Sequence, residues 1–475
     1  LYAISKVIIT RLRQNSREAR LHKLRQVRTF AVLDGSRSAP TARFVQSLCH
    51  ELSLRGSVAR VDAASVDAAL GAGVSSTPSA AGATDARLLE WLSQLESSHD
   101  FLVYDASGST AWQERALHQA DRVLVLGFAH EPPSPAVVAT FDSFKIRARV
   151  DVVLFRPYGA EACLAWRTAY HAQGHYFLRP GHDDDLASLG HQLTGHGLGV
   201  VLGGGGARGF AHIGLLRALD ELKLPIDLIG GTSMGAFFGA LLASGADSRE
   251  LRRIANETFV QQNYLNDFVL PRVSLIRGRR FSTRLRAIFG EQMIEELPLS
   301  YFCVSTNLTR GTAMIHRQGP LSLWVGTSMA VPGVAPPVVW NGDLLADGAI
   351  TNSLPTDIMQ ADGRGPIIAS DVSTEGGLSM PGVDGPDPEA LLKQNRDGTA
   401  LRLADILFRS ATLTSESGTK ARAARADLYL RMPVSGIGLF EWKRVDELIE
   451  RGYRHAQRGL EGFVSRLDSL DDEAR

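Results

Sequence analysis

The sequence predicts an α/β protein with two domains, each built on a sheet covered by helices, and two observations support this. First, short apolar segments alternate with helical patterns through the first half of the 475 residues, which is typical of a parallel sheet. Expected strands lie at 29–34, 101–105, 122–127 and 151–157, and expected helices at 41–54, 86–97 and 111–120. Second, a new strand–helix alternation begins at residue 198 with a glycine-rich turn.

Composition excludes several classes of protein. Lys+Arg and Asp+Glu both number 51, so no overall positive charge indicates nucleic-acid binding. Cys49, Cys163 and Cys303 lie far apart, which argues against a disulfide framework or a metal site and favours a reducing compartment. No apolar run approaches the roughly 18 residues that span a bilayer. We therefore expect a cytoplasmic protein.

The pattern of residues 1–28 predicts a basic helix that connects an upstream domain, absent from this sequence, to the rest of the chain. Leu1, Ile4, Ile8 and Leu12 share one face at helical spacing, and the second half is rich in arginine. A membrane-surface helix is the alternative. Because the sequence starts without Met and has no signal-peptide layout, we expect a fragment cut on its N-terminal side.

Residues 29–196 are interpreted as a smaller α/β domain with a scaffold or regulatory role. Its "DGSRSAP" turn (34–40) sits where a phosphate-binding loop would sit but lacks the Gly-Lys-Ser/Thr that holds a nucleotide. Residues 71–85 have the composition of a flexible loop. The "GHDDDL" cluster (181–186) is expected at a helix N-terminus, where acidic residues favour the dipole, and not at a metal.

The stretch "LGVVLGGGGARGFAHIGLLRAL" (198–219) places a glycine run between an apolar strand and a helix. Backbone N–H groups at such a turn bind a phosphate, a dinucleotide or the oxyanion of an acyl-transfer intermediate. Gly204, Gly206 and Gly209 also match the spacing of the dinucleotide fingerprint. The glycines alone leave these alternatives open.

A second motif, Gly231-Thr232-Ser233-Met234-Gly235, lies between a short strand and an apolar helix. It fits the G-x-S-x-G nucleophile elbow, in which a strained turn carries the serine hydroxyl clear of the sheet. With the upstream glycine loop as an oxyanion hole, one geometry explains both motifs. A dinucleotide site would leave Ser233 unexplained, and its ribose-binding acid, Asp227, opens a strand where such an acid should end one.

The serine needs a base, and the candidates are few. His316 and His455 are the only downstream histidines, and neither has a motif around it. His212 follows the glycine loop but is expected to be a packing or capping residue. Asp347-Gly348-Ala349 follows a short apolar run, and Gly348 would allow a sharp turn that keeps the Asp347 carboxylate accessible. A plain Asp-Gly turn is the alternative.

Residues 198–375 resemble a patatin-like phospholipase domain. The boxes GGGARG (204–209), GTSMG (231–235) and DGA (347–349) occur in family order, and "TSMAVPGVAPPV" (327–338) resembles the segment between the last two. The wider chain is similar to bacterial relatives of neuropathy target esterase. In these relatives, the closing helix of a cyclic-nucleotide-binding-like domain is similar to "LYAISKVIITRLR" (1–13). Their segment between that domain and the patatin domain is similar to "DRVLVLG" (121–127).

The resemblance implies a three-layer α/β/α sandwich and a Ser–Asp dyad without histidine, with Ser233 as nucleophile and Asp347 as general base. The implied oxyanion hole draws on the glycine loop, with the Gly205 and Gly206 amides preferred and Arg208 helping to fix the loop. The motif residues concerned are Gly204, Gly205, Gly206, Arg208 and Gly209 in the loop, Gly231 and Gly235 in the elbow, and Gly348 and Ala349 after the aspartate. No cofactor or metal is implied.

The implied function is hydrolysis of acyl esters of phospholipids or lysophospholipids by a protein peripheral to the membrane. A cyclic nucleotide could act through missing N-terminal domains. The arginine-rich segment 269–290 is expected to face the membrane or the substrate mouth, with a solvated helix and loop as the alternative. Residues 376–475 are expected to form a loop and a helical extension packed on the catalytic domain.

Two other functions remain open from sequence. An NAD(P)-binding oxidoreductase would show a nucleotide-dependent change in fluorescence or melting temperature. A non-catalytic regulatory protein of the same fold would not react with a fluorophosphonate probe, whereas a serine esterase would.

Overall fold

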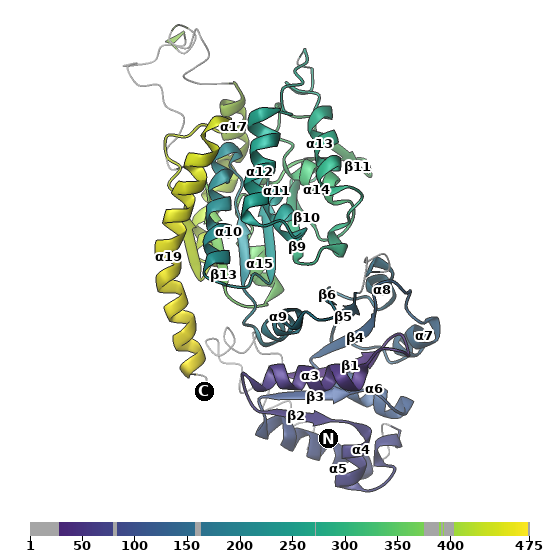
Figure 1. Ribbon diagram of the computed structural model, residues 1–475. Helices are drawn as coiled ribbons and strands as arrows, with labels where there is room; N and C mark the ends of the chain where they lie inside the picture. The colour runs from purple at the N-terminus through teal and green to yellow at the C-terminus, as the bar shows by residue number, and fades with distance from the viewer. Residues whose placement is uncertain are drawn as a thin grey trace. The chain divides into compact units, whose positions relative to one another are not determined.

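The computed structural model describes residues 28–78, 83–156, 163–270, 272–374, 389–390, 393 and 403–473 (Figure 1). Two compact units divide the chain at Gly197–Leu198, and residues 363–365 group with the first unit. Each unit has its own sheet with helices, which confirms the α/β class. The helix expected at 1–28 lies outside the described residues, apart from Arg28.

The first unit contains a six-stranded, fully parallel sheet in the order β2-β3-β1-β4-β5-β6. Its strands are β1 (Thr29–Asp34), β2 (Val58–Val61), β3 (Phe101–Asp105), β4 (Arg122–Phe128), β5 (Arg149–Phe155) and β6 (Gly174–Leu178). Its helices are α3 (Thr41–Ser53), α4 (Ala63–Leu70), α5 (Ala83–Ser98), α6 (Thr110–Gln119), α7 (Pro135–Ser143), α8 (Cys163–Ala169) and α9 (Asp183–Thr194).

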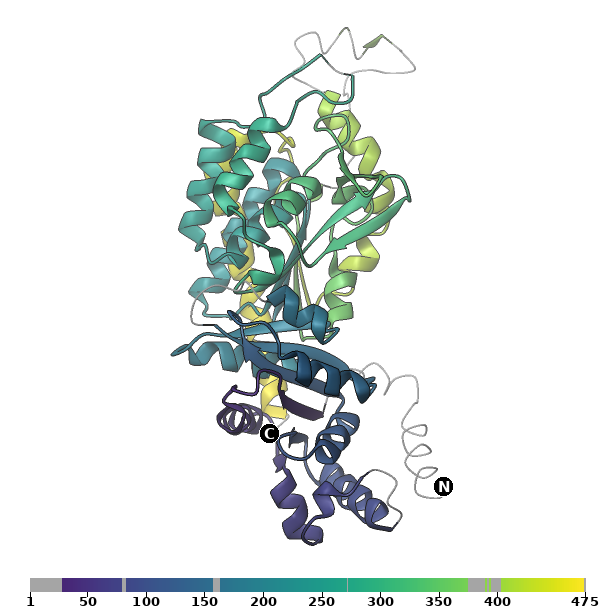
Figure 2. The ribbon, with the colours of Figure 1, turned by 90° about the vertical axis from the view of Figure 1, so that its right-hand side faces the viewer.

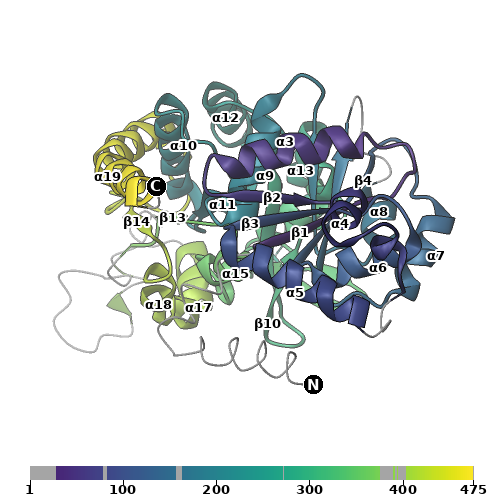
Figure 3. The same cartoon turned by 90° about the horizontal axis from the view of Figure 1, so that it is seen from below.

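Helices cover both faces of this sheet, as Figure 3 shows for α3 and α9 on one face and α5 and α6 on the other. Both faces of the central strands are therefore buried, and these strands are apolar nearly throughout, as parallel strands usually are. Residues 71–85 are not simply a loop, because Val74–Ser76 form a 3₁₀ turn and α5 begins at Ala83.

Two acidic segments of this unit make local backbone contacts or begin a helix. Asp34 Oδ1 accepts hydrogen bonds from the N–H groups of Ser36 and Ala39 (3.0 and 3.3 Å). The carboxylate thus uses amides of the "DGSRSAP" turn that an anion would need. The "GHDDDL" aspartates lie in the first turn of α9, which confirms the predicted helix start.

The second unit contains an eight-stranded mixed sheet, in the order β11-β12-β9-β8-β7-β13-β14 with β10 paired to β9. Its strands are β7 (Gly199–Leu202), β8 (Leu228–Thr232), β9 (Ser300–Asn307), β10 (Thr312–His316), β11 (Val338–Trp340), β12 (Asp343–Asp347), β13 (Ile367–Asp371) and β14 (Leu428–Arg431). Its α-helices are α10 (Ala211–Glu221), α11 (Met234–Ala243), α12 (Ser248–Ala255), α13 (Arg279–Phe289), α14 (Leu321–Ser328), α15 (Thr356–Asp362), α17 (Leu403–Ser417), α18 (Thr419–Ala423) and α19 (Val445–Glu473).

This sheet is the middle of three layers (Figure 2). Helices α10, α11, α12 and α19 bury apolar side chains on one face, and α15 does so on the other. The C-terminal region contributes to the sheet itself, because β14 pairs in parallel with β13. The sequence predicts only a loop and helices there, since the four residues of β14 carry little periodicity.

Candidate active site

Ser233 occupies a strained turn between β8 and α11. Its backbone has φ 54° and ψ −121°. Residues that bear a side chain rarely adopt this conformation, and holding a residue in such a region costs of the order of 1–3 kcal/mol. The flanking glycines allow the close packing of this turn. A Cβ on Gly235 would lie 2.1 Å from the Leu202 carbonyl oxygen, and one on Gly231 would lie 2.5 Å from the Gly235 carbonyl carbon. The predicted elbow is therefore present.

Strand β9 brings Asp347 to this turn. In the sheet register, Thr232 of β8 pairs with Val304 and Asp347 of β12 pairs with Ser305. The nucleophile turn and the aspartate thus lie on either side of two consecutive β9 residues. Gly348 contributes by close approach, since a Cβ there would lie 2.2 Å from the Val304 carbonyl oxygen. Gly348 begins the expected turn, a 3₁₀ segment over Gly348–Ile350. The expectation that this turn keeps the Asp347 carboxylate accessible is wrong, because Asp347 is 0% exposed.

The two side chains are joined directly. Ser233 Oγ donates a 2.7 Å hydrogen bond to Asp347 Oδ2, and the Ala349 N–H donates to Oδ1 at 2.8 Å. Burial raises the pKa of Asp347 to about 7, although these two hydrogen bonds act to lower it. Half of the Asp347 carboxyls are therefore ionised near neutral pH, which suits a general base.

The elbow has a further support that the motifs do not reveal. The Ser233 N–H donates to Ser328 Oγ at 2.9 Å, and the Ser328 hydroxyl donates to the Val304 carbonyl at 2.6 Å. Ser328 is fully buried at the end of α14. It ties the turn to β9, the strand that also positions Asp347. The "TSM" segment around Ser328 was noted from resemblance, but no residue pattern assigns it this role.

The glycine loop follows β7, and its amides have different uses. The N–H groups of Gly203 and Gly204 donate to the carbonyls of Ser370 and Ser353, and that of Ala207 donates to Leu439. In the described part of the chain, the N–H groups of Gly205 and Gly206 donate no hydrogen bond. Gly206 also has φ 56° and lines the same cavity as Ser233.

The remaining loop residues have structural contacts. Arg208 Nε donates to the Ile437 carbonyl at 2.8 Å, so its guanidinium fastens the loop to the C-terminal region. Gly209 lets the loop pack on α11, because a Cβ there would lie 2.4 Å from Met234 Cγ. Of the five predicted loop residues, Gly204 thus has its N–H engaged, and the Gly205 and Gly206 amides remain the preferred candidates.

The three histidines considered as bases make other contacts. His212 is buried and both ring nitrogens are engaged, with Ser370 Oγ at 2.8 Å and the Gly203 carbonyl at 2.9 Å. His316 bonds Ser305 Oγ at 2.7 Å and stacks on Trp324. Burial lowers the pKa of His212 and of His316 to about 4. His455 lies on α19, where burial lowers its pKa.

Ser233 opens into a small apolar cavity of about 50 Å³. Although the turn carries the serine clear of the sheet, Ser233 is only 5% exposed. Aromatic and aliphatic side chains of the C-terminal region, which no predicted motif includes, cover it. The lining side chains from that region are Phe408, Leu439, Phe440 and Trp442. A sequence signal for three of them is the run "GLFEW" (438–442), which holds three large apolar side chains.

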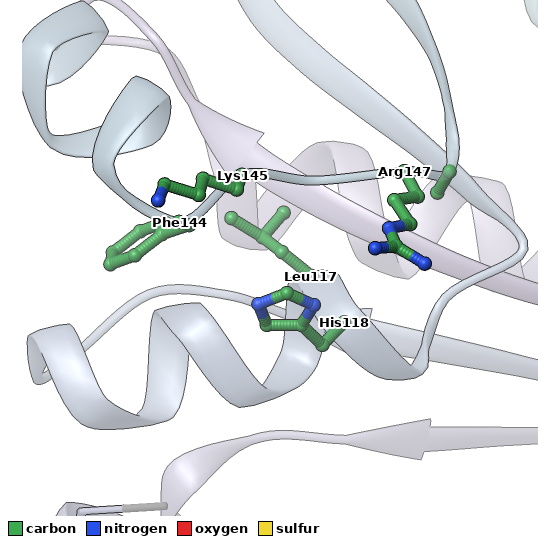
Figure 4. Close-up of a pocket in the computed structure, with 6 residues that line it drawn as sticks. Leu117, His118, Phe144, Lys145 and Arg147 are labelled. Carbon is green, nitrogen blue, oxygen red and sulfur yellow. The ribbon is translucent and has the colours of Figure 1, made fainter.

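A larger hollow lies in the first unit but contains no comparable chemistry. Figure 4 shows it lined by Leu117, His118, Phe144, Lys145 and Arg147, with a volume of about 520 Å³. No serine, cysteine or carboxylate lines it. Within the described ranges, no three His, Cys, Asp or Glu side chains are grouped to hold a metal ion. Among those same residues, no helix has the length and apolar character that crossing a bilayer requires.

The dinucleotide alternative gains no support from the geometry. Asp227, the candidate ribose ligand, is 2% exposed, and its Oδ2 accepts the Leu198 N–H at 2.8 Å. The carboxylate thus helps to join two strand ends inside the second unit and is not presented to a ribose.

Each of the two units matches the model of a known protein family. Residues 200–359 match the model of the patatin-like phospholipases, and residues 26–180 match that of the Neuropathy Target Esterase family P-loop like domain. An uncharacterised NTE family protein of Mycobacterium tuberculosis is 32% identical over 78% of this chain and 63% of its own length.

Two longer relatives match this chain over a smaller share of their own length. Patatin-like phospholipase domain-containing protein 7 of Mus musculus is 29% identical over 92% of this chain and 35% of its own. Lysophospholipase NTE1 of Mycosarcoma maydis is 29% identical over 79% of this chain and 24% of its own. The chain thus spans between about a quarter and two thirds of the relatives that it matches.

Proposed function

Because the chain contains a patatin-like phospholipase domain and a Neuropathy Target Esterase family P-loop like domain, we propose that it hydrolyses acyl esters of phospholipids or lysophospholipids through Ser233 and Asp347. The observation that carries this proposal is the 2.7 Å hydrogen bond from Ser233 Oγ to Asp347 Oδ2. It joins an alcohol nucleophile to a base whose pKa burial raises to about 7.

In the first half-reaction, Ser233 Oγ attacks the acyl carbonyl carbon while its proton passes to Asp347 Oδ2. The N–H groups of Gly205 and Gly206 stabilise the negative charge that develops on the carbonyl oxygen. The tetrahedral intermediate then expels the alcohol or lysolipid, which takes the proton from Asp347. The product on the enzyme is an acyl ester of Ser233.

In the second half-reaction, water replaces the departed alcohol. Asp347 takes a proton from water as the water oxygen attacks the acyl carbon, and the same two amides again bind the oxyanion. When the intermediate collapses, Ser233 Oγ recovers the proton from Asp347 and the fatty acid leaves. Asp347 ends each half-reaction in the ionised state in which it began.

The lining of the Ser233 cavity supports an apolar acyl group as the substrate part nearest the nucleophile. Ile276, Phe281, Met329 and Trp442 are among the side chains there, and burial of an acyl chain against them gains about 0.8 kcal/mol per methylene. The aliphatic chains of lipids fit this lining, whereas a charged acyl group would lose its solvation.

The test is fatty-acid release from lysophosphatidylcholine micelles and from phosphatidylcholine vesicles. The wild-type chain should release fatty acid from at least one of them, and Ser233→Ala should not. Ser248→Ala, a substitution at the start of α12, is the matched control and should leave release unchanged. Equal release by Ser233→Ala and wild type would overturn the proposal.

A further inference from the structure

A loop of the second unit, here called the tip loop (residues 267–270 and 272–278), exposes apolar side chains to an unusual degree. Leu270, Phe268 and Val273 are 81%, 73% and 68% exposed, the three highest values for large apolar residues in the described part of the chain. In Figure 1 the chain runs outward into a narrow loop before it returns to α13. Contiguous exposed apolar residues are typical of an interaction surface.

The tip loop is held outward by its backbone. The Val269 N–H donates to the Leu275 carbonyl at 3.0 Å, which closes the loop as a hairpin. The N–H groups of Leu275 and Ile276 donate to the Gly333 and Val334 carbonyls at 2.9 and 3.0 Å. These bonds fix the base of the loop to a segment that lines the Ser233 cavity. The apolar tip therefore cannot become buried without breaking them.

Positive charge accompanies this apolar tip. Arg272, Arg277 and Arg279 line a hollow of about 360 Å³ together with Leu270 and Val273. Within the described ranges, none of the three arginines pairs with an acidic side chain. Arginines beside exposed apolar side chains are complementary to a surface with anionic phosphates above an apolar layer.

The helical half of the predicted basic segment differs from the tip loop. In α13, Phe281, Leu285 and Phe289 are buried in the core, and Arg284 pairs with Glu257 at 3.0 Å. The expectation that all of 269–290 faces a membrane or the substrate mouth is thus too broad. The exposed apolar and basic groups are concentrated before and at the start of α13.

The tip loop is also continuous with the candidate active site. Ile276 lines both the hollow at the tip and the cavity of Ser233. Arg277 and Pro336 line the tip hollow and an intermediate cavity of about 200 Å³, and that cavity shares Phe281 and Met329 with the Ser233 cavity. The three hollows adjoin one another from the tip to the nucleophile.

We propose that the tip loop docks the protein on an anionic phospholipid bilayer. Leu270, Phe268 and Val273 enter the boundary of the acyl layer, while Arg272, Arg277 and Arg279 lie among the lipid phosphates. The adjoining hollows would then receive an acyl ester directly from the bilayer. This last step rests on the proposed function, whereas docking itself does not.

Docking is tested by co-sedimentation with vesicles, in a Ser233→Ala background so that the lipid stays intact. The vesicles contain phosphatidylcholine alone or mixed with phosphatidylserine. Arg272→Glu/Arg279→Glu should weaken binding to the mixed vesicles at least about 25-fold, because each basic residue near an anionic surface contributes about fivefold. Leu270→Glu/Val273→Glu should weaken binding to both kinds of vesicle.

Two exposed positions outside the tip loop serve as matched controls. Leu54→Glu changes an apolar side chain that is 57% exposed, and Arg249→Glu reverses a charge on α12. Both should bind vesicles as the Ser233→Ala parent does. Binding that is unchanged in the tip-loop variants, or reduced equally in the controls, would overturn the docking proposal.

Hydrolysis separates this inference from the proposed function. With Ser233 restored, the rate on vesicles relative to that on a soluble short-chain ester should fall in the tip-loop variants. If vesicle binding follows the prediction but no ester is hydrolysed, the proposed function fails and docking stands. If esters are hydrolysed but the ratio and the binding are unchanged, docking fails and the proposed function stands.

Discussion

Ser233 Oγ donates its hydrogen bond to Asp347 Oδ2 at 2.7 Å although the two residues are 114 positions apart. The register of β9 between β8 and β12 creates this proximity. Asp347 has no solvent contact, so water does not stabilise its negative charge. The two hydrogen-bond donors, Ser233 Oγ and the Ala349 N–H, stabilise the ionised carboxylate instead.

Substitution of either partner should abolish turnover. Ser233→Ala removes the attacking oxygen, and Asp347→Asn keeps the shape but removes the base. We expect kcat to fall at least about 10³-fold in each, and the double variant to be no worse than the single ones, because residues that act as a unit are not additive. Steady-state assays on one soluble ester measure this. Additive losses in the double variant would show that the two residues act independently.

The pH dependence of kcat/KM should report the Asp347 carboxyl. The base must be ionised to accept the Ser233 proton, and burial raises its pKa to about 7. We expect kcat/KM to rise about tenfold per pH unit below 7 and to level off above it. A profile that is flat between pH 5 and pH 8 would contradict the assignment of Asp347 as the base.

Stability should also depend on pH through Asp347. The folded protein keeps its proton up to about pH 7, whereas the unfolded chain releases it near 3.8. Folding thus binds a proton between these values, and the free energy of unfolding of the wild type falls as pH rises through that window. Asp347→Asn cannot ionise and should lack this loss, which is on the order of a few kcal/mol.

Urea unfolding of wild type and Asp347→Asn at pH 5 and pH 8 measures this effect. The variant should gain stability relative to wild type between the two pH values, whatever its stability at either one. A constant difference would show that Asp347 does not titrate in this window.

Ser328→Ala should weaken the elbow without removing any reacting group. It leaves the buried Ser233 N–H without its 2.9 Å partner, which costs about 1–3 kcal/mol of stability. We expect a lower melting temperature and a lower kcat with KM nearly unchanged, since the apolar cavity stays intact. Thermal unfolding and steady-state kinetics test this, and an unchanged kcat would show that Ser328 is structural only.

The motif residues of the candidate site can be predicted from the sequence because each motif is a short, continuous stretch of the chain. The elbow, the glycine loop and Asp347-Gly348-Ala349 are short turns whose residue types are dictated by close backbone approach, as at Gly235 and Gly348. Strand–helix alternation likewise predicts the central strands, which are apolar nearly throughout. These features need no knowledge of distant contacts.

What the sequence misses depends on distant packing. Ser328, Leu439 and Phe440 reach Ser233 only through the tertiary fold, and no spacing in the sequence links them to the nucleophile. The short strands β2 and β14 gain their conformation by pairing with β3 and β13. The burial of Ser233 could not be predicted either, because it comes from the C-terminal region.

The most direct test of a Ser–Asp dyad without histidine is the rate of fluorophosphonate labelling, with the modified residue mapped by mass spectrometry. The wild-type chain should carry the adduct on Ser233, and Asp347→Asn should label at least about 10³-fold more slowly. His212→Ala, His316→Ala and His455→Ala should each keep at least about a tenth of the wild-type labelling rate, since none contacts Ser233 or Asp347 by a hydrogen bond. A loss in any folded histidine variant as large as that in Asp347→Asn would replace the dyad by a triad.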